Sequence, residues 1–263
     1  MRIRIPNYLI YVKILRGEFS TLKGDWQLMQ ITKRDSCFIV AIDVFVYNQA
    51  MNFQQMSPQL AELALFESGH LYAGADNPQQ VQRQLADWAR AGKVVQLRRG
   101  LYTLSPSYQS EQPHSYVIAN HLVPASYVSL HTVLSYYDLI PEHVAVVTSV
   151  TTGRPRTRQN PYGRFSFQHI QPALFFGFEY RQVTQTQWAY MATPEKALLD
   201  LIYLTPDADS EGYIRALRLQ NLDQLDVEQL TAHVERAAKP KLKRALSHIL
   251  QVVEEELTEY VPL

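Results

Sequence analysis

The clearest pattern of apolar and polar positions lies in residues 77–104. Three apolar residues recur there at i, i+4 and i+7, the spacing of one buried face of an α-helix: Val81, Leu85 and Trp88. Asn77 is a favoured N-cap residue, and Pro78 suits the first helical position because the N–H that proline lacks has no partner there. The pattern therefore predicts a helix that begins after Asn77 and ends before Gly92.

The opposite face of this helix is polar. On a period of 3.6 residues, long hydrogen-bonding or cationic side chains lie opposite the apolar stripe, namely Gln79, Arg83 and Arg90. Beyond the helix, two alternating segments, 93–97 and 101–104, flank Arg98-Arg99-Gly100 and predict a tight two-stranded hairpin. A helix followed by such a hairpin is typical of a winged helix-turn-helix.

Little of the chain is left for the middle helix of such a domain. The first predicted helix lies at 60–68, so only 69–76 separates it from Asn77. We expect the middle helix to be a single turn or to be missing. If it is missing, 70–73 is expected to form the first strand of the small sheet beside the hairpin.

The rest of the chain predicts a second, mixed α/β part. Segment 105–113 is polar and contains prolines, as expected of a connector. The patterns beyond it predict helices at 115–122 and 129–137 and strands at 144–150, 164–170 and 173–180. Thr193 and Pro194 begin a further helix with an apolar face, which consists of Ala197, Leu198, Leu201 and Ile202.

From residue 209 onward the pattern is helical, with segments at 211–220, 227–238 and 241–259. The expected fold class is α+β. A winged helix-turn-helix over 51–105 precedes a mixed α/β domain over 106–263 that ends in helices.

Residues 1–50 differ in pattern from the rest of the chain. The apolar segment 37–47 contains Asp43 and is too short to span a bilayer, and it lies too far from the start to be the core of a signal peptide. A pair of strands remains open for it. Because Met51 opens the segment that leads into the first helix, we expect translation to begin at Met51 or Met56 and residues 1–50 to be an upstream extension.

Composition is that of an ordinary globular protein, with 263 residues, 46% hydrophobic and 19% charged. The single cysteine excludes an internal disulfide framework and fits a reducing cytoplasm, where we expect the protein to act, with no membrane contact. The formal net charge is zero, yet residues 79–100 carry one acid, Asp87, against five cations, namely Arg83, Arg90, Lys93, Arg98 and Arg99. Local positive charge beside glutamines predicts binding to duplex DNA, since cations neutralise phosphates and glutamine and arginine read base edges. The alternative is a solvated helix and hairpin.

A second basic segment covers residues 151–164. It contains glycines, prolines and no acid, and its cations are Arg154, Arg156, Arg158 and Arg164. We expect a loop between two strands. It either contacts a phosphate, a nucleic acid or a partner, with Tyr162 available to stack on a base, or it is a solvated hairpin whose arginines pair with the acidic C-terminal helices.

The sequence contains no convincing set of catalytic residues. The nearest approach to a metal nuclease is Glu179 with Arg181, which no lysine accompanies, and the histidines lack the spacing of metal ligands. We therefore expect no enzyme, no metal and no cofactor. The alternatives are a nucleic-acid-modifying enzyme and an interaction module in which the winged helix binds protein.

Four segments, in this order and spacing, resemble one family, the AbiEi-type antitoxins of type IV toxin-antitoxin systems, also described as transcriptional regulators of viral defence. They are QVQRQLADWARAGKVVQLRRGLYTL, SYVSLHTVLSYYDLIPE, TSVTTGRPRTRQNPYGRFSFQHIQPALFFGF and MATPEKALLDLIYL. The resemblance covers about residues 57–263. It implies a winged helix that represses its own operon and a C-terminal domain that counters a nucleotidyltransferase-type toxin encoded nearby. By matching position, the implied DNA contacts are Gln79, Gln80, Arg83, Arg98, Arg99 and Tyr102.

A single small module buries too little surface for tight specific binding. We therefore expect two copies to bind inverted repeats in the promoter of the protein's own gene. A solitary transcriptional regulator without a toxin remains an alternative.

Overall fold

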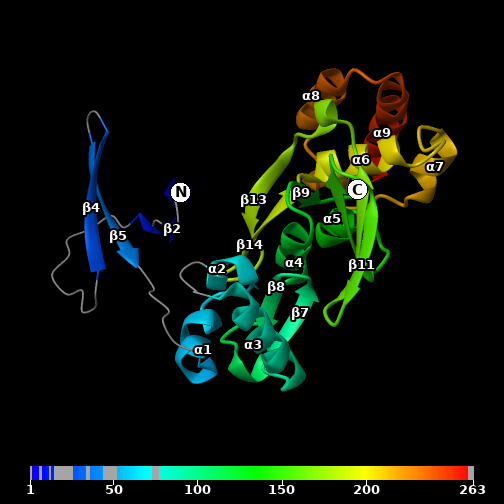
Figure 1. The fold of residues 1–263 in the computed structure, drawn as a ribbon. Coiled ribbons are helices and arrows are strands. Elements are labelled where there is room, and N and C mark those ends of the chain that lie inside the picture. The colour runs from blue at the N-terminus through cyan, green and yellow to red at the C-terminus, as the bar shows by residue number, and fades with distance from the viewer. Residues whose placement is uncertain are drawn as a thin grey trace. The chain divides into compact units, whose positions relative to one another are not determined.

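The computed structural model describes residues 2–5, 8–11, 13–14, 26–33, 36–43, 52–72 and 77–259, and its fold is mixed α/β (Figure 1). The chain divides into two compact units, unit 1 over Met1–Glu111 and unit 2 over Gln112–Leu263. The boundary lies inside the polar segment 105–113.

The first part of unit 1 contains short antiparallel strands. β1 (Arg2–Ile5) pairs with β2 (Tyr8–Tyr11), and β5 (Ser36–Asp43) pairs with β3 (Lys13–Ile14) on one side and β4 (Trp26–Lys33) on the other. Much of the apolar segment 37–47 therefore lies in a strand. Met51, where we expect translation to begin, lies outside the described residues.

The second part of unit 1 packs three helices around a small sheet. The helices are α1 (Phe53–Ala61), α2 (Ser68–Tyr72) and α3 (Pro78–Arg90). β6 (Phe66–Glu67), β7 (Val94–Arg98) and β8 (Leu101–Leu104) form an antiparallel sheet in the order β6-β8-β7. After the sheet, η1 (Pro106–Tyr108) returns to α1, where the rings of Tyr108 and Phe53 meet edge to face at 4.9 Å.

One apolar cluster holds these elements together. Its members are buried and come from each helix and from the sheet, namely Phe53, Met56, Leu60, Phe66, Leu71, Val81, Leu85, Trp88, Val94 and Leu104. Burying a side chain of this kind contributes roughly 1.5–3 kcal/mol, so the cluster is the main stabilising feature of this part of unit 1.

The structure corrects the expected order of elements before α3. The middle helix is present as a single turn, α2, as one of the two expected alternatives required, and residues 70–72 are therefore helical rather than part of a strand. The small sheet begins earlier, at β6, because Phe66 enters the core with 2% exposure and pairs with Tyr102. The first helix, α1, covers Phe53–Ala61 and so begins and ends earlier than the expected 60–68. Leu71, which belongs to the alternative strand segment, enters the same core from α2.

A six-stranded sheet forms the centre of unit 2, in the order β11-β12-β10-β9-β14-β13. Its strands are β9 (Ser126–Val128), β10 (Val146–Thr151), β11 (Arg156–Asn160), β12 (Gly163–His169), β13 (Phe178–Gln182) and β14 (Trp188–Ala192). β12 runs parallel to β10, and β14 runs parallel to β9, while the other neighbours are antiparallel.

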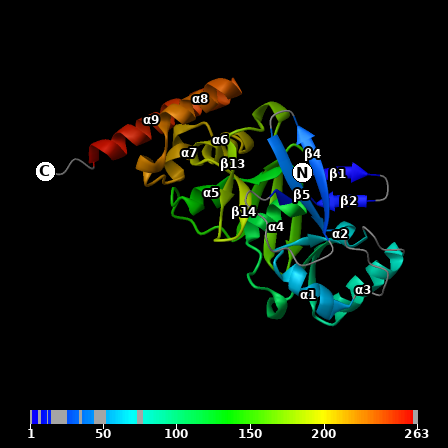
Figure 2. The same cartoon turned by 90° about the vertical axis from the view of Figure 1, so that its left-hand side faces the viewer.

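Helices accompany this sheet and form the C-terminal end of unit 2. α4 (Ser115–Leu122) packs against β9 and β14, and α5 (His131–Tyr136) packs against β10 and α6 (Pro194–Leu204). α7 (Glu211–Ala216), α8 (Val227–Ala237) and α9 (Pro240–Glu259) come next, with η2 (Pro172–Leu174) and η3 (Leu222–Gln224) as short connecting turns. α8 and α9 lie side by side (Figure 2). The predicted helical C-terminal part is thus present.

The basic segment 151–164 is not the loop that we expected. Most of it forms an antiparallel hairpin in which β11 pairs with β12, with Arg158 opposite Phe165 and Gln159 opposite Arg164. β11 reads RTRQN and lacks the apolar alternation that reveals a strand. Its pairing to β12, rather than a buried face, makes it a strand.

Candidate nucleic-acid interface

The local sequence fixes where α3 begins and which side chains its first turn presents. The Oδ1 atom of Asn77 accepts hydrogen bonds from the backbone N–H groups of Gln79 (3.0 Å) and Gln80 (3.3 Å), and Pro78 occupies the first turn. This cap satisfies two N–H groups that a helix otherwise leaves without partners. Gln79 and Gln80 are exposed, as is Arg83 one turn later.

The apolar stripe of α3 faces the core as predicted. Val81, Leu85 and Trp88 are buried, and the indole of Trp88 meets the Phe53 ring edge to face at 5.2 Å. Because this face is fixed, the opposite face of α3 is exposed, including Arg83 and Arg90. The helix therefore presents hydrogen-bonding and cationic side chains on a rigid support.

A tight turn connects β7 and β8. Arg98 pairs with Leu101, which leaves Arg99 and Gly100 as the turn residues. Gly100 has a φ of +80°, a conformation that side chains disfavour, and a Cβ there would lie 3.3 Å from the Ser68 Oγ. Its carbonyl accepts a 2.9 Å hydrogen bond from the Ser68 N–H. Arg99 is exposed at this turn.

Three of the cations predicted to contact DNA have partners inside unit 1. The Arg98 guanidinium lies 3.3 Å from the Glu67 carboxylate and donates a 3.0 Å hydrogen bond to the Arg99 carbonyl. Arg90 forms an ion pair with Asp87 on α3. The Lys93 ammonium lies 4.9 Å from the centroid of the Phe53 ring.

Arg83 and Arg99 differ from these three cations. Both are exposed, and neither forms an ion pair with any residue that the structure describes. Like Lys93, they carry a charge that no carboxylate within the described residues neutralises, but unlike the half-buried Lys93 they are exposed.

The sequence prediction missed Gln96, which belongs to the same hairpin. Gln96 lies opposite Tyr102, and its Nε2 donates a 3.0 Å hydrogen bond to the Tyr102 hydroxyl. The Tyr102 ring in turn stacks on the buried Phe66 at 5.9 Å. Gln96 is exposed between partly or fully buried neighbours in β7. This strand alternation could have identified Gln96 as a surface residue of the hairpin.

The second basic segment lies on the β11–β12 hairpin of unit 2. Arg154, Arg156, Arg158 and Arg164 are all exposed. The Arg156 Nε donates a 3.2 Å hydrogen bond to the Arg154 carbonyl, and within the described ranges these arginines form no ion pair with a carboxylate. The hairpin expected as an alternative is therefore present, but its pairing with the acidic C-terminal helices is not found among the described residues.

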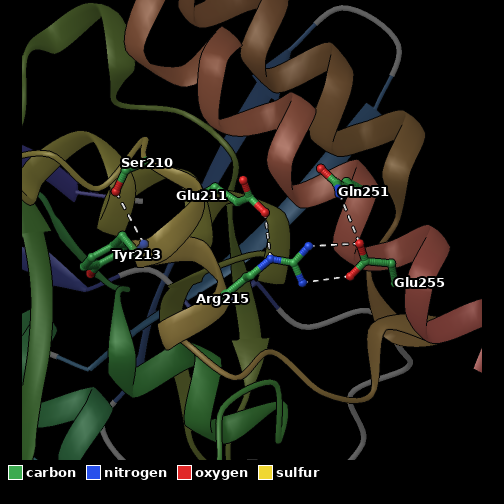
Figure 3. Close-up of polar contacts among 6 residues, drawn as sticks. All are labelled: Ser210, Glu211, Tyr213, Arg215, Gln251 and Glu255. Atoms are coloured by element: carbon green, nitrogen blue, oxygen red, sulfur yellow. Dashed lines mark hydrogen bonds and ion pairs between the residues drawn. The ribbon is translucent and has the colours of Figure 1, made fainter.

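Arg215 of α7 pairs with the acidic end of α9 instead (Figure 3). Its guanidinium donates to both carboxylate oxygens of Glu255, at 2.8 and 2.9 Å, and its Nε donates to Glu211 at 2.9 Å. Gln251 also donates to Glu255, at 3.1 Å. These hydrogen bonds lower the pKa of Glu255 below its ordinary value and join α7 to α9.

A buried polar network connects α6 to β9. Lys196 and Asp200 of α6 form an ion pair with 2% and 1% exposure, and Asp200 also accepts hydrogen bonds from Tyr127 (2.9 Å) and Ser129 (2.8 Å). Burial raises the pKa of Asp200 and lowers the pKa of Lys196, while each partner opposes the shift of the other. Burial likewise raises the pKa of Tyr127.

The network contains acid and base groups but is enclosed. The cavity beside Lys196 and Asp200 is lined mainly by apolar side chains, such as Leu174, Phe176, Leu199 and Leu242, and holds about 10 Å³, room for about one water molecule. The cavity has no room for a substrate, and the contacts of Asp200 hold α6 beside β9. The sequence pattern identified α6 as part of the core, but it did not predict the buried ion pair between Lys196 and Asp200. The i, i+4 spacing of these two opposite charges in an otherwise apolar helix could have indicated it.

The residues considered for catalysis lie on the surface. Glu179 and Arg181 of β13 are exposed and form an ion pair of 3.4 Å with each other. Over the part of the chain that the structure describes, no three His, Cys, Asp or Glu side chains gather as metal ligands. In that same part, no helix is long and apolar enough to cross a membrane.

Comparison with known proteins adds no family to this description. No protein-family model matches the chain, and no curated protein matches it.

Proposed function

We propose that this protein is a transcriptional regulator that binds duplex DNA through unit 1. In this proposal α1, α2 and α3 with the β6-β8-β7 sheet act as a winged helix-turn-helix, in which α3 is the recognition helix and the β7–β8 hairpin is the wing. The observation that carries the proposal is the exposed face of α3, on which Gln79, Gln80 and Arg83 are held by a capped helix and a buried apolar stripe.

The chemistry of these side chains suits base recognition in the major groove. Glutamine forms paired hydrogen bonds with adenine N6 and N7, and arginine forms them with guanine O6 and N7. Gln79, Gln80 and Arg83 come from the first half of α3, the half that recognition helices direct at base edges. The capped N-terminus also favours a nearby phosphate, because the helix dipole is positive there.

The wing supplies a contact to the DNA backbone. Arg99 is exposed at the hairpin turn, and the Ser68–Gly100 hydrogen bond and the Arg98–Glu67 ion pair hold this turn to the elements before α3. Because the turn is held in place, an Arg99 side chain that binds a phosphate does not also have to order the backbone of the turn. Arg98, which we expected to contact DNA, then has a positioning role, and Tyr102 with Gln96 forms the outer surface of the hairpin.

The resemblance to AbiEi-type antitoxins supports a more specific function. We propose that two copies bind inverted repeats in the promoter of the protein's own gene, and that unit 2 counters a nucleotidyltransferase-type toxin encoded nearby. Such a protein acts in the cytoplasm and needs no cofactor. The proposal assigns no enzymatic activity, because Asp200 is buried with its partners and Glu179 forms an exposed ion pair with Arg181.

Footprinting of the full chain on its own promoter tests the proposal. The expected result is protection of an inverted repeat. Gln80→Ala and Arg83→Ala should each weaken specific binding by about 1–3 kcal/mol, the contribution of one paired contact to a base. Gln82→Ala, an exposed glutamine on the other flank of α3, is the matched control and should leave affinity unchanged. Absence of a protected repeat with the original chain, or equal effects of all three substitutions, would contradict the assignment of α3.

A further inference from the structure

The outermost strand β13 presents an exposed aromatic surface. Tyr180 is 58% exposed, and its ring lies 5.7 Å from the ring of Trp188 and 4.8 Å from that of Tyr190, both on β14. Trp188 and Tyr190 are themselves 43% and 46% exposed. Large exposed aromatic side chains that gather on one face are typical of interaction surfaces.

The hydrogen bonds of β13 leave one set of its backbone groups directed outward. Thr193 donates to the Gly177 carbonyl and Val183 donates to the Gln187 carbonyl, so odd-numbered residues of this strand bond to the β14 side. Antiparallel pairing alternates, which directs the N–H and C=O groups of Phe178, Tyr180 and Gln182 to the open edge. Among the described residues no strand pairs with that edge.

The sequence of β13 is complementary to itself when two copies run antiparallel. A two-fold axis at Tyr180 sets Tyr180 opposite Tyr180 of the second copy as a hydrogen-bonded pair. The outward-directed groups of Phe178 and Gln182 then pair with Gln182 and Phe178 of that copy. Glu179 comes opposite Arg181 of the second copy, and Arg181 opposite Glu179, at the closer spacing of non-hydrogen-bonded pairs. Charge, hydrogen bonding and aromatic contact agree on one register.

The other edge of the same sheet lacks this complementarity. β11 carries Arg156 and Arg158 and no acid, and an antiparallel pairing centred on Thr157 or Arg158 sets arginines opposite each other. Like charges on an outer strand oppose edge-to-edge association. Of the two outer strands, β13 therefore favours a second copy of the chain, whereas β11 disfavours it.

We propose that two copies of this protein associate through antiparallel pairing of their β13 strands, with Tyr180 at the two-fold axis. The interface is isologous and closed, because the β13 edge of each copy is paired with that of the other and a third copy finds no open β13 edge. A five-residue strand and three aromatic side chains make a small interface, so the association is weak and depends on concentration. The proposal concerns the free protein and does not rest on DNA binding.

Sedimentation equilibrium of the full chain without DNA, over a range of concentrations, tests this register by charge reversal. Glu179→Arg places an arginine opposite Arg181 of the second copy, and Arg181→Glu places two glutamates opposite each other, so each single variant should weaken dimerisation by roughly tenfold or more. The double variant Glu179→Arg/Arg181→Glu restores both ion pairs and should dimerise like the original chain. An equimolar mixture of the two single variants should form a mixed dimer for the same reason.

Arg156→Glu, on the opposite edge of the sheet, is the control and should leave dimerisation unchanged. Thermal unfolding of each variant checks that the exposed substitutions leave the fold intact. The proposal is overturned if the original chain remains monomeric up to roughly 1 mM, the result expected if the β13 edge binds a different protein instead of a second copy. It is also overturned if the double variant stays as weak as the single ones.

Discussion

The guanidinium of Arg98 lies 3.3 Å from the carboxylate of Glu67, which joins the hairpin after α3 to the strand before α2. Arg98 and Arg99 are adjacent in the sequence, yet Arg99 is exposed whereas the side chain of Arg98 is only 28% exposed. The two arginines therefore have different roles. Arg98 supports the position of the hairpin, and Arg99 is the cation that the turn presents to a partner.

Glu67→Gln should release Arg98 from its carboxylate partner and add a cation to the DNA-binding surface. If the freed guanidinium contacts one phosphate, the slope of log K against log salt becomes more negative by about 0.9. Fluorescence anisotropy across a salt series measures this slope. Glu62→Gln, which removes an exposed negative charge just after α1, is the control. Equal slopes for the two variants would show that Arg98 is not held back from DNA by Glu67.

Asp200→Ala should destabilise unit 2 strongly, because it leaves Lys196 buried without its carboxylate. Loss of one partner of a buried ion pair typically costs about 3–5 kcal/mol. Urea denaturation measures the change in the free energy of unfolding. Glu179→Ala, which breaks an exposed pair, should cost no more than about 1 kcal/mol.

Replacing both members of the buried pair provides a second test. Lys196→Met with Asp200→Leu removes both charges and should recover much of the stability that Asp200→Ala loses, since apolar groups of similar volume often replace a buried pair at little cost. The Tyr127 and Ser129 hydroxyl groups lose an acceptor in this variant, which limits the recovery. A double variant no more stable than Asp200→Ala would show that the lost hydrogen bonds to Asp200, which both variants lack, cause the destabilisation rather than the unpaired charge of Lys196.

Stability should fall as the pH decreases below about 6.5, partly because of His233. Burial lowers the pKa of His233 below its ordinary value of 6.5, and Lys196 and Arg236 add to this effect, while Glu195 and Asp200 oppose it. Between the lowered pKa and 6.5 the unfolded chain binds more protons than the folded one, so protonation favours unfolding. The stabilising contribution is complete above pH 6.5 and is lost as the pH falls.

Urea midpoints at pH 7.5 and pH 5.5 measure this dependence. His233→Gln should reduce the difference between the two midpoints, and His131, whose pKa burial also lowers, should account for part of what remains. A His233→Gln variant with the full pH dependence would contradict the role of this residue.

The elements that the sequence predicted well are those whose apolar periodicity matches a buried face. α3 with its Asn77 cap and the β7–β8 hairpin have this property, and so does α4, whose predicted bounds agree with the structure. Strand β11 escaped prediction because none of its five residues is apolar and only pairing with β12 defines it.

Side-chain partners were harder to predict than elements. The Arg98–Glu67 and Asp200–Tyr127 contacts join residues that are 31 and 73 positions apart, and nothing local in the sequence specifies such pairs. The candidate site shows the consequence. The sequence identified the cations of the site, but it did not show which of these cations form ion pairs with carboxylates of the same chain.

The central claim is that the exposed cations of α3 and the wing contact DNA phosphates or bases. The most direct measurement is the salt dependence of DNA affinity for the full chain and for Arg83→Ala/Arg99→Ala, with Lys243→Ala/Arg244→Ala on α9 as a control that removes the same charge. We predict that the slope of log K against log salt flattens by about 1.8 in the first variant, about 0.9 for each lost contact, and is unchanged in the control. Equal slopes and affinities for the original chain and Arg83→Ala/Arg99→Ala would contradict the claim.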